Sequence, residues 1–224
     1  RPMLPSSTVE NYLKALYQAE TTREERALVP MGELATTVGV APGTATTMVK
    51  ALAESGLVEY EPYLGVRLSP SGTKLAALVL RRHRLIEQFL VEIMGMSWAD
   101  VHEDAEQLEH VVSDRLVERM DAMLGRPSVD PHGDPIPTAN GDMESPEYYS
   151  LLTCPLGTPV KVTRVADQDA DFLRFLEAQE LKPGQSIEVE ARDPVADSVQ
   201  LRTGDERRIT IGTKAASKLL LEAL

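Results

Sequence analysis

The spacing of proline and glycine over the first 72 residues limits the fold more than any other feature. Pro42 stands where a helix would begin, since proline is favoured at a first helical position, and Gly56 ends that helix. A shorter helical pattern precedes it, and two β-like runs follow at residues 57–60 and 65–68. This order of helix, short helix, turn, helix and hairpin predicts a winged helix-turn-helix over residues 1–72.

The rest of the chain changes from helical to strand-like patterns. Residues 73–94 and 99–124 are expected to form two long helices, and residues 126–146 are rich in proline, glycine and aspartate, which is typical of a linker. Short strand-like runs follow, with one short helix among them. The sequence therefore predicts a mainly α chain with a small β component: a helical domain over 73–145, then a small β-barrel over 146–224.

Composition restricts the class of protein. The longest apolar run is far shorter than the ~20 residues that span a bilayer, and no apolar signal-peptide core is seen, so we expect a cytoplasmic protein. Cys154 is the single cysteine and cannot form an internal disulfide. The net charge of −12 disfavours DNA binding when taken alone. Residues 81–145, however, contain 14 of the 35 acidic residues and only 6 basic ones, and bound divalent cations would offset part of that excess.

The second helix of the expected helix-turn-helix exposes small hydroxyl residues near its start. Such side chains can approach DNA closely and bond phosphates or base edges, and a basic residue adds a phosphate contact. The candidate DNA contacts are Gly43, Thr44, Thr46, Thr47 and Lys50, with Arg67 on the hairpin. The alternative is that these threonines only cap and pack a short helix.

Histidines and carboxylates gather at helical spacing in the expected central domain. His102, Glu106, Glu109 and His110 fall within about 100° of arc on one helix face. The preceding helix offers His83 and Glu87, four residues apart on one face. A solvated acidic helix with surface histidines is the alternative, but matched sets on two helices favour a metal site.

The donor types indicate which metal would bind. Carboxylate and imidazole without thiolate suit Mn(II) or Fe(II), whereas Co(II), Ni(II) or Zn(II) could still bind in vitro. A metalloenzyme is a rival interpretation, although no Glu-x-x-His pair on two helices and no nucleophile set is seen. A protein-interaction module whose metal only stabilises the fold is a second rival.

Residues 8–13, 82–87, 102–114 and 131–137 make the chain resemble the diphtheria toxin repressor family of metal-dependent regulators. The last segment, Pro131-His132-Gly133-Asp134-Pro135-Ile136-Pro137, is a signature of the family's dimerisation domain. The resemblance covers almost the whole chain. It implies a homodimeric repressor of metal-uptake genes that binds a palindromic operator in double-stranded DNA. It also implies an SH3-like (FeoA-like) C-terminal domain, no membrane partner, no small organic substrate and no enzymatic activity.

The resemblance also implies ligand sets. By position, the primary activating site would be Glu106, Glu109 and His110, and the second site His83, Glu87 and His102. Iron-sensing members have a cysteine where Glu106 stands and manganese-sensing members a glutamate, which favours Mn(II) over Fe(II).

Several positions depart from the family pattern. Asn11 stands where relatives supply a methionine or aspartate ligand, and Lys14 where some manganese regulators have a second glutamate. Asp169 and Asp171 are candidate ligands from the barrel, and His132 is interpreted as structural. The hypothesis is that a metal held by Asn11 and the central helix fixes the DNA-binding head of each subunit, so that two heads match successive major grooves.

Overall fold

The computed structural model describes residues 6–21, 23, 27–143 and 147–224. The chain divides into two compact units, one formed by residues 1–83 and 137–143, the other by residues 84–136 and 144–224. Three domains were expected, and their boundary at residues 145–146 lies outside the described residues. Among those that are described, no helix is long and apolar enough to cross a membrane.

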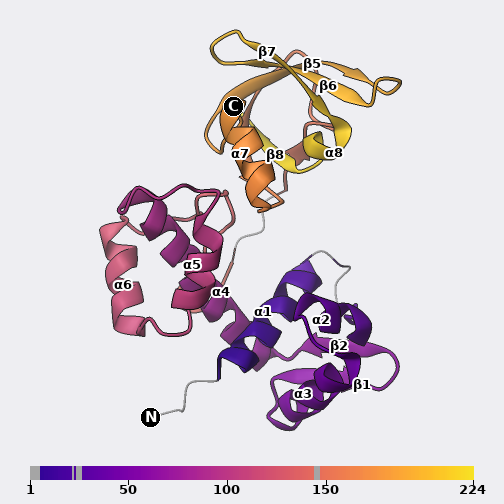
Figure 1. Cartoon of the computed structure of the whole chain (residues 1–224), viewed down its shortest axis with the longest axis vertical. Coiled ribbons are helices and arrows are strands. Elements are labelled where there is room, and N and C mark those ends of the chain that lie inside the picture. Colours follow the sequence, from indigo (N-terminus) through magenta and orange to yellow (C-terminus); the bar gives the residue numbers. More distant parts are fainter. Residues whose placement is uncertain (1–5, 22, 24–26, 144–146) are drawn as a thin grey trace. The chain divides into compact units, whose positions relative to one another are not determined.

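The first unit is a winged helix-turn-helix, as the sequence predicts (Figure 1). Its elements in chain order are α1 (Ser7–Thr21), α2 (Met31–Thr37), α3 (Pro42–Glu54), β1 (Val58–Glu61), β2 (Gly65–Leu68) and the start of α4 (Pro70–Glu92). Pro42 is the first residue of α3, and Gly56 adopts a φ of 73° just beyond its end. Apolar residues of α1, α2 and α3 bury a common core with the hairpin, among them Leu13, Leu16, Leu34, Val49 and Val66.

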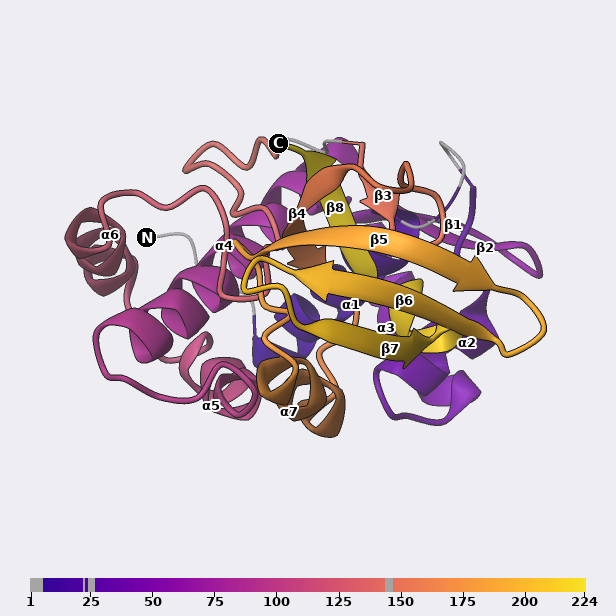
Figure 2. The ribbon, with the colours of Figure 1, turned by 90° about the horizontal axis from the view of Figure 1, so that it is seen from above.

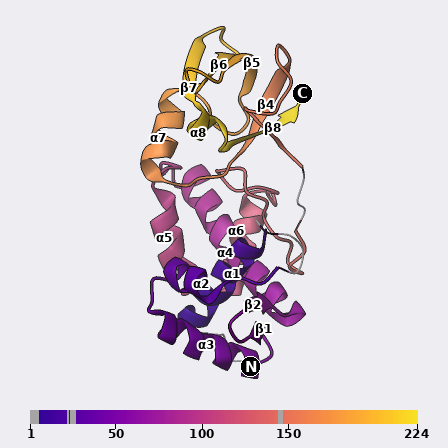
Figure 3. The same ribbon diagram turned by 90° about the vertical axis from the view of Figure 1, so that its right-hand side faces the viewer.

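The second unit begins with the remainder of α4 and two further helices, α5 (Val101–Leu108) and α6 (Asp114–Met123), which both lie near it (Figure 3). Ile86 and Leu90 of α4 pack against Val101 and Ala105 of α5, whereas Leu85 packs near Val117 of α6. The single helix expected over 99–124 is wrong. Ser113 caps a new helix by accepting a hydrogen bond from Leu116 N at 3.4 Å.

A six-stranded antiparallel sheet completes the second unit, in the order β3-β8-β4-β5-β6-β7. The strands are β3 (Tyr149–Ser150), β4 (Pro159–Val165), β5 (Ser186–Asp193), β6 (Ser198–Thr203), β7 (Arg208–Gly212) and β8 (Leu219–Ala223). Two helices accompany them, α7 (Ala170–Ala178) and α8 (Thr213–Ala216). Register shifts after Val162 and Val189 mark bulges, which help the sheet curl (Figures 1 and 2). This agrees with the expected SH3-like barrel.

The sheet and the central helices of this unit share buried residues. Trp98 and Ala99, which lie just before α5, are part of the same apolar core as Leu173 and Leu219. The turn at residues 130–135 also meets the sheet, since Val165 N donates to His132 O at 2.8 Å.

Candidate metal centre

Two groups of potential ligands lie in the second unit. The first consists of Glu106 on α5 and of Glu109 and His110 in the turn that follows it. One ligand atom from each lies within 4.8 Å of the others. Glu109 is fully buried, while His110 and Glu106 are partly exposed, so this group has access to solvent. Carboxylates held together in this way repel one another unless a cation or proton lies between them.

The second group was only partly foreseen from the sequence. Glu87 of α4 lies with Asp130 and His132 so that one ligand atom from each is within 4.8 Å of the others. All three residues are buried. Asp130 is not among the ligands that the sequence predicts, and the sequence favours a structural role for His132. The Asp130-Pro131-His132 spacing was the signal that could have suggested them.

His102 connects the two groups. Its Nδ1 lies 3.1 Å from Glu87 Oε1, and its Nε2 lies 3.8 Å from Glu106 Oε1. The structure therefore brings Glu87 and His102 together, as predicted for a second site. Because the His102 ring lies near the carboxylates of both Glu87 and Glu106, it could bind a metal ion in either group.

The turn that holds Asp130 and His132 is shaped by hydrogen bonds from its own backbone. Asp130 Oδ1 accepts from His132 N at 2.8 Å and from Asp134 N at 2.9 Å. Gly133 adopts a φ of 84°, and a Cβ there would lie 1.9 Å from Thr163 O. Only glycine fits that position, because both the conformation and the close approach exclude a side chain.

Electrostatics of the buried group favour a bound cation. Burial, together with the charges of Asp134 and Glu87, raises the pKa of Asp130 to about 7. Burial alone would lower the pKa of His132, but the facing carboxylates of Glu87 and Asp130 outweigh it and raise that pKa to about 9. Asp130 Oδ2 and His132 Nδ1 are buried without a hydrogen-bond partner among the described residues. Oxygen and imidazole donors in this state fit Mn(II) or Fe(II) better than a thiolate-preferring ion.

Asp134 ties the same turn to the sheet. Its carboxylate pairs with Arg164 of β4 and accepts from Gln168 Nε2 at 2.9 Å. Arg84 of α4 lies 3.9 Å from it and also donates to Pro135 O. The buried ligands are thus embedded in contacts between α4, the turn and the sheet.

Asp169 and Asp171, the predicted ligands from the barrel, are not brought into either group. Asp169 caps α7 by accepting from Phe172 N at 3.0 Å. Asp171 is 94% exposed and pairs with Arg174 at 2.9 Å. Both carboxylates have these local roles, and their roles as metal ligands remain predictions.

His83 and Asn11 belong to the first unit. His83 is buried on α4, where its Nδ1 lies 3.3 Å from Lys14 Nζ of α1. Asn11 is an exposed residue of α1. Their roles as ligands remain predictions.

The candidate DNA contacts lie where the sequence predicts, on α3 and the hairpin. Gly43, Thr44, Thr47 and Lys50 are exposed, and Thr46 is half-buried. The Thr46 and Thr47 hydroxyls donate to Pro42 O and Gly43 O at 2.8 and 3.0 Å, which leaves their methyl groups and lone pairs for a partner. Arg67 lies on β2, where it pairs with Glu59 at 2.6 Å.

Comparison with family models divides the chain into three consecutive parts. Residues 4–66 match the model described as "Iron dependent repressor, N-terminal DNA binding domain". Residues 69–138 match "Iron dependent repressor, metal binding and dimerisation domain". Residues 149–223 match the FeoA domain.

Individual relatives agree over most of the chain. The diphtheria toxin repressor of Corynebacterium efficiens is 34% identical over 193 residues, 81% of this chain and 82% of the relative. The iron-dependent repressor IdeR of Mycobacterium leprae is 26% identical over 96% of both chains. A solved structure of a manganese-dependent transcriptional repressor in complex with manganese has a TM-score of 0.85 and 37% identity, covering 96% of this chain and 100% of its own.

Proposed function

This chain belongs to the iron-dependent repressor family that includes the diphtheria toxin repressor, and we propose that it represses metal-uptake genes in response to Mn(II). Its relatives are metal-dependent transcriptional repressors. The observation that carries the proposal is the group Glu106, Glu109 and His110, whose ligand atoms lie within 4.8 Å of one another.

The choice of Mn(II) is supported by the donors. Two carboxylates and an imidazole are hard or borderline ligands, and no thiolate is near, because the one cysteine, Cys154, is buried in the core of the sheet. The relative with a solved structure at 37% identity is named manganese-dependent. Fe(II) is the second candidate, since the relative from Mycobacterium leprae is named an iron-dependent repressor.

We assign the two groups different tasks. Glu106, Glu109 and His110 would hold the activating ion, and the buried Glu87, Asp130 and His132 would hold a second one. A bound ion supplies positive charge that offsets the carboxylates. The protein residues determine the geometry: His102 and Glu87 position α5 against α4, and the hydrogen bond between His132 and Val165 positions the 130–135 turn against the sheet.

DNA would be bound by two copies of the winged helix in a homodimer. Each α3 would enter a major groove, so a palindromic operator in double-stranded DNA is expected. The exposed residues of α3 contain one cation, Lys50, and no arginine. Affinity should therefore depend on phosphate contacts and DNA shape more than on bidentate contacts to guanine.

The test uses a duplex selected by the full-length protein from a random-sequence library in the presence of Mn(II). Fluorescence anisotropy then measures its Kd with Mn(II), with Fe(II) under anaerobic conditions, and with chelator. We expect Glu106→Ala and His110→Ala to abolish the metal response. Glu103→Ala is the matched control, because Glu103 is an exposed carboxylate of α5 outside both groups. If the two variants respond like the control, the assignment of the site is wrong.

A further inference from the structure

Two polar contacts join α1 to the first part of α4 inside the winged-helix unit. Arg82 of α4 pairs with Glu10 of α1, with 3.4 Å between Nη1 and Oε1. One turn further along α1, Lys14 Nζ lies 3.3 Å from His83 Nδ1. The relative exposures of Glu10, Lys14 and His83 are only 4%, 6% and 3%. The charged end of a lysine is therefore held beside an imidazole in the interior of the unit.

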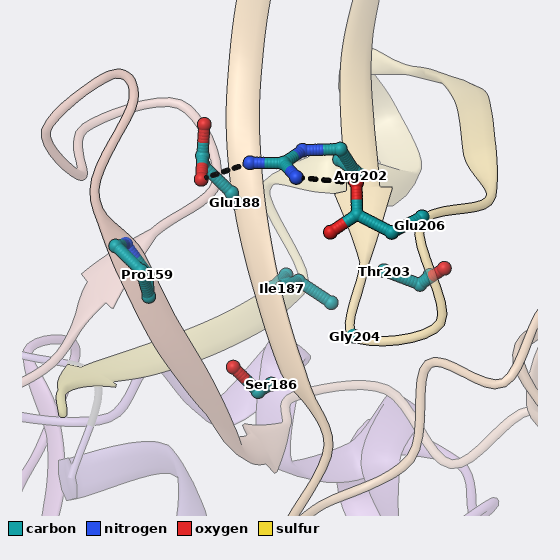
Figure 4. A pocket seen from close by; sticks show the side chains of 8 residues that line it. All are labelled: Pro159, Ser186, Ile187, Glu188, Arg202, Thr203, Gly204 and Glu206. Carbon is teal, nitrogen blue, oxygen red and sulfur yellow. Dashed lines mark hydrogen bonds and ion pairs between the residues drawn. The ribbon is translucent and has the colours of Figure 1, made fainter.

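This contact differs in kind from the ion pairs of the sheet. Arg202 of β6, for example, lines a pocket and donates to the carboxylates of Glu188 and Glu206 at 2.7 and 2.5 Å (Figure 4). A cation beside a carboxylate offsets its negative charge. A cation beside a neutral imidazole has another effect, because either ring nitrogen can carry the single proton. The cation then decides which nitrogen carries it.

The chemistry of lysine determines the tautomer of His83. An ammonium group has three donors and no acceptor, so in this contact Lys14 Nζ donates and His83 Nδ1 accepts. A neutral imidazole that accepts at Nδ1 carries its proton on Nε2. The lone pair of Nδ1 is then used by Lys14, and Nε2 has no lone pair to offer. In this state neither nitrogen of His83 can bind a metal ion.

Metal binding by His83 would need a different arrangement. A histidine that binds metal through one nitrogen usually donates the N–H of the other to a carboxylate, a carbonyl or a water. Binding through Nε2 would place the proton on Nδ1, where it would face the ammonium of Lys14, which cannot accept it. Binding through Nδ1 would bring the metal ion against the same ammonium, and two cations repel each other strongly in a buried place. Both modes are unfavourable while Lys14 is present.

We propose that Lys14 excludes His83 from the metal centre and so determines which side chains can hold the ions. This rests on the proposed function, since it concerns the ligands of that metal-dependent repressor. The resemblance to the family assigns His83 to a second site. With Lys14 in place, the second ion is held without His83, by the buried group of Glu87, Asp130 and His132. Lys14 is thus a specificity-determining residue that acts through the histidine beside it.

The tautomer can be measured in the full-length protein without changing Lys14. In the metal-free protein with ¹⁵N-labelled histidines, two-dimensional NMR distinguishes a protonated ring nitrogen from an unprotonated one, and His83→Asn identifies the signals of His83. We expect the proton on Nε2 and none on Nδ1. A His83 ring that carries a proton on Nδ1 would overturn the inference, because Lys14 could not then be donating to it.

Paired substitutions test the consequence for metal binding, measured as Mn(II) affinity by competition with a fluorescent chelator. In the wild type, His83→Asn should change the affinity by less than about twofold. Lys14→Gln supplies an amide oxygen that can accept from Nδ1–H, so in this background His83→Asn should weaken binding about tenfold or more. Lys14→Arg can only donate, and His83→Asn should again have little effect beside it.

Lys161→Gln controls for the loss of one positive charge. Lys161 lies on β4 and pairs with Glu222 at 3.1 Å, so this substitution removes the same charge far along the sequence from His83. In that background His83→Asn should have as little effect as in the wild type. A tenfold loss for His83→Asn in the wild type, or no loss beside Lys14→Gln, would overturn the inference and leave the proposed function intact. A wild type that binds no Mn(II) would overturn both.

Discussion

The imidazole of His132 is fixed by Trp98: its Nε2 lies 2.8 Å from the Trp98 carbonyl oxygen, and the two rings stack with centroids 5.6 Å apart. Nε2–H donates to that carbonyl, so Nδ1 is directed toward Glu87 Oε2 at 3.7 Å and Asp130 Oδ1 at 3.8 Å. A carbonyl that orients an imidazole in this way is the usual support for a metal-binding histidine. This orientation would present Nδ1 to the ion that we propose for the buried group.

Metal binding at the buried group should depend on pH. The pKa of His132 is raised to about 9, so in the metal-free protein at neutral pH both ring nitrogens carry a proton and the ring is positively charged, whereas a ligand imidazole must be neutral. Binding therefore releases a proton, and the apparent affinity should rise about tenfold per pH unit from pH 7 toward pH 9, then level off.

Calorimetry in two buffers of different ionisation enthalpy measures that proton release directly. His132→Gln keeps a polar side chain but removes the titrating ring, and its residual metal binding should show a shallower pH dependence. An affinity of the wild-type buried group that does not change over this pH range contradicts the assignment of His132.

Replacing Glu106 by cysteine should change metal preference without abolishing binding. A thiolate is a softer donor than a carboxylate and disfavours Mn(II) relative to Zn(II) or Fe(II). Competition against a fluorescent chelator should show that the ratio of Mn(II) to Zn(II) affinity falls about tenfold or more. Glu103→Cys, on the same helix but outside both groups, should leave the ratio unchanged. A ratio that is unaltered in Glu106→Cys would exclude Glu106 as a ligand.

Gly133→Ala should destabilise the second unit strongly. The new Cβ would lie 1.9 Å from Thr163 O, and a φ of 84° adds strain, so a loss of about 3 kcal/mol or more in the free energy of unfolding is expected. Gly157→Ala is the matched control, because Gly157 has a φ of 64° but no neighbour within 4 Å of its added Cβ. Gly157→Ala should lower the free energy of unfolding by only about 1–2 kcal/mol. Denaturant unfolding that gives equal losses for the two variants would contradict the close contact.

Gly43→Ala should separate folding from DNA binding on α3. An added Cβ meets nothing within 4 Å, so the variant should be as stable as the wild type or up to about 1 kcal/mol more stable. If DNA approaches this helix end closely, the methyl group should weaken binding to the selected duplex several-fold. Gly32→Ala of α2, where an added Cβ also meets nothing within 4 Å, should stabilise the fold to a similar extent. It should reduce the affinity for the duplex less than Gly43→Ala does. Unchanged DNA affinity in Gly43→Ala would remove Gly43 from the interface.

Local patterns were sufficient for much of this structure. The limits of α3 follow from Pro42 and Gly56, and the grouping of Glu106, Glu109 and His110 follows from spacing within a few residues. Such features depend on backbone geometry that each short segment determines for itself. The winged helix and the grouping of these potential ligands at the end of α5 could therefore be predicted before any tertiary contact was known.

Contacts between segments that are distant in the sequence could not be predicted from local patterns. Asp130 and His132 lie near Glu87 only because a turn distant in sequence packs beside α4. No periodic pattern in the sequence indicates this contact. The interruption after Leu108 was missed because the apolar pattern continues through it, although Ser113 is a good helix cap. The capping of α7 by Asp169, a predicted ligand, was likewise not anticipated.

We propose that a cation held by Glu106, Glu109 and His110 controls DNA binding. The most direct measurement is the Kd of the full-length protein for its selected duplex, titrated against free Mn(II) from chelated to saturating conditions. The affinity should increase about 100-fold over the titration, and His110→Ala should remove this increase while Glu103→Ala retains it. An affinity that stays the same after thorough chelation would rule out control of DNA binding by the cation.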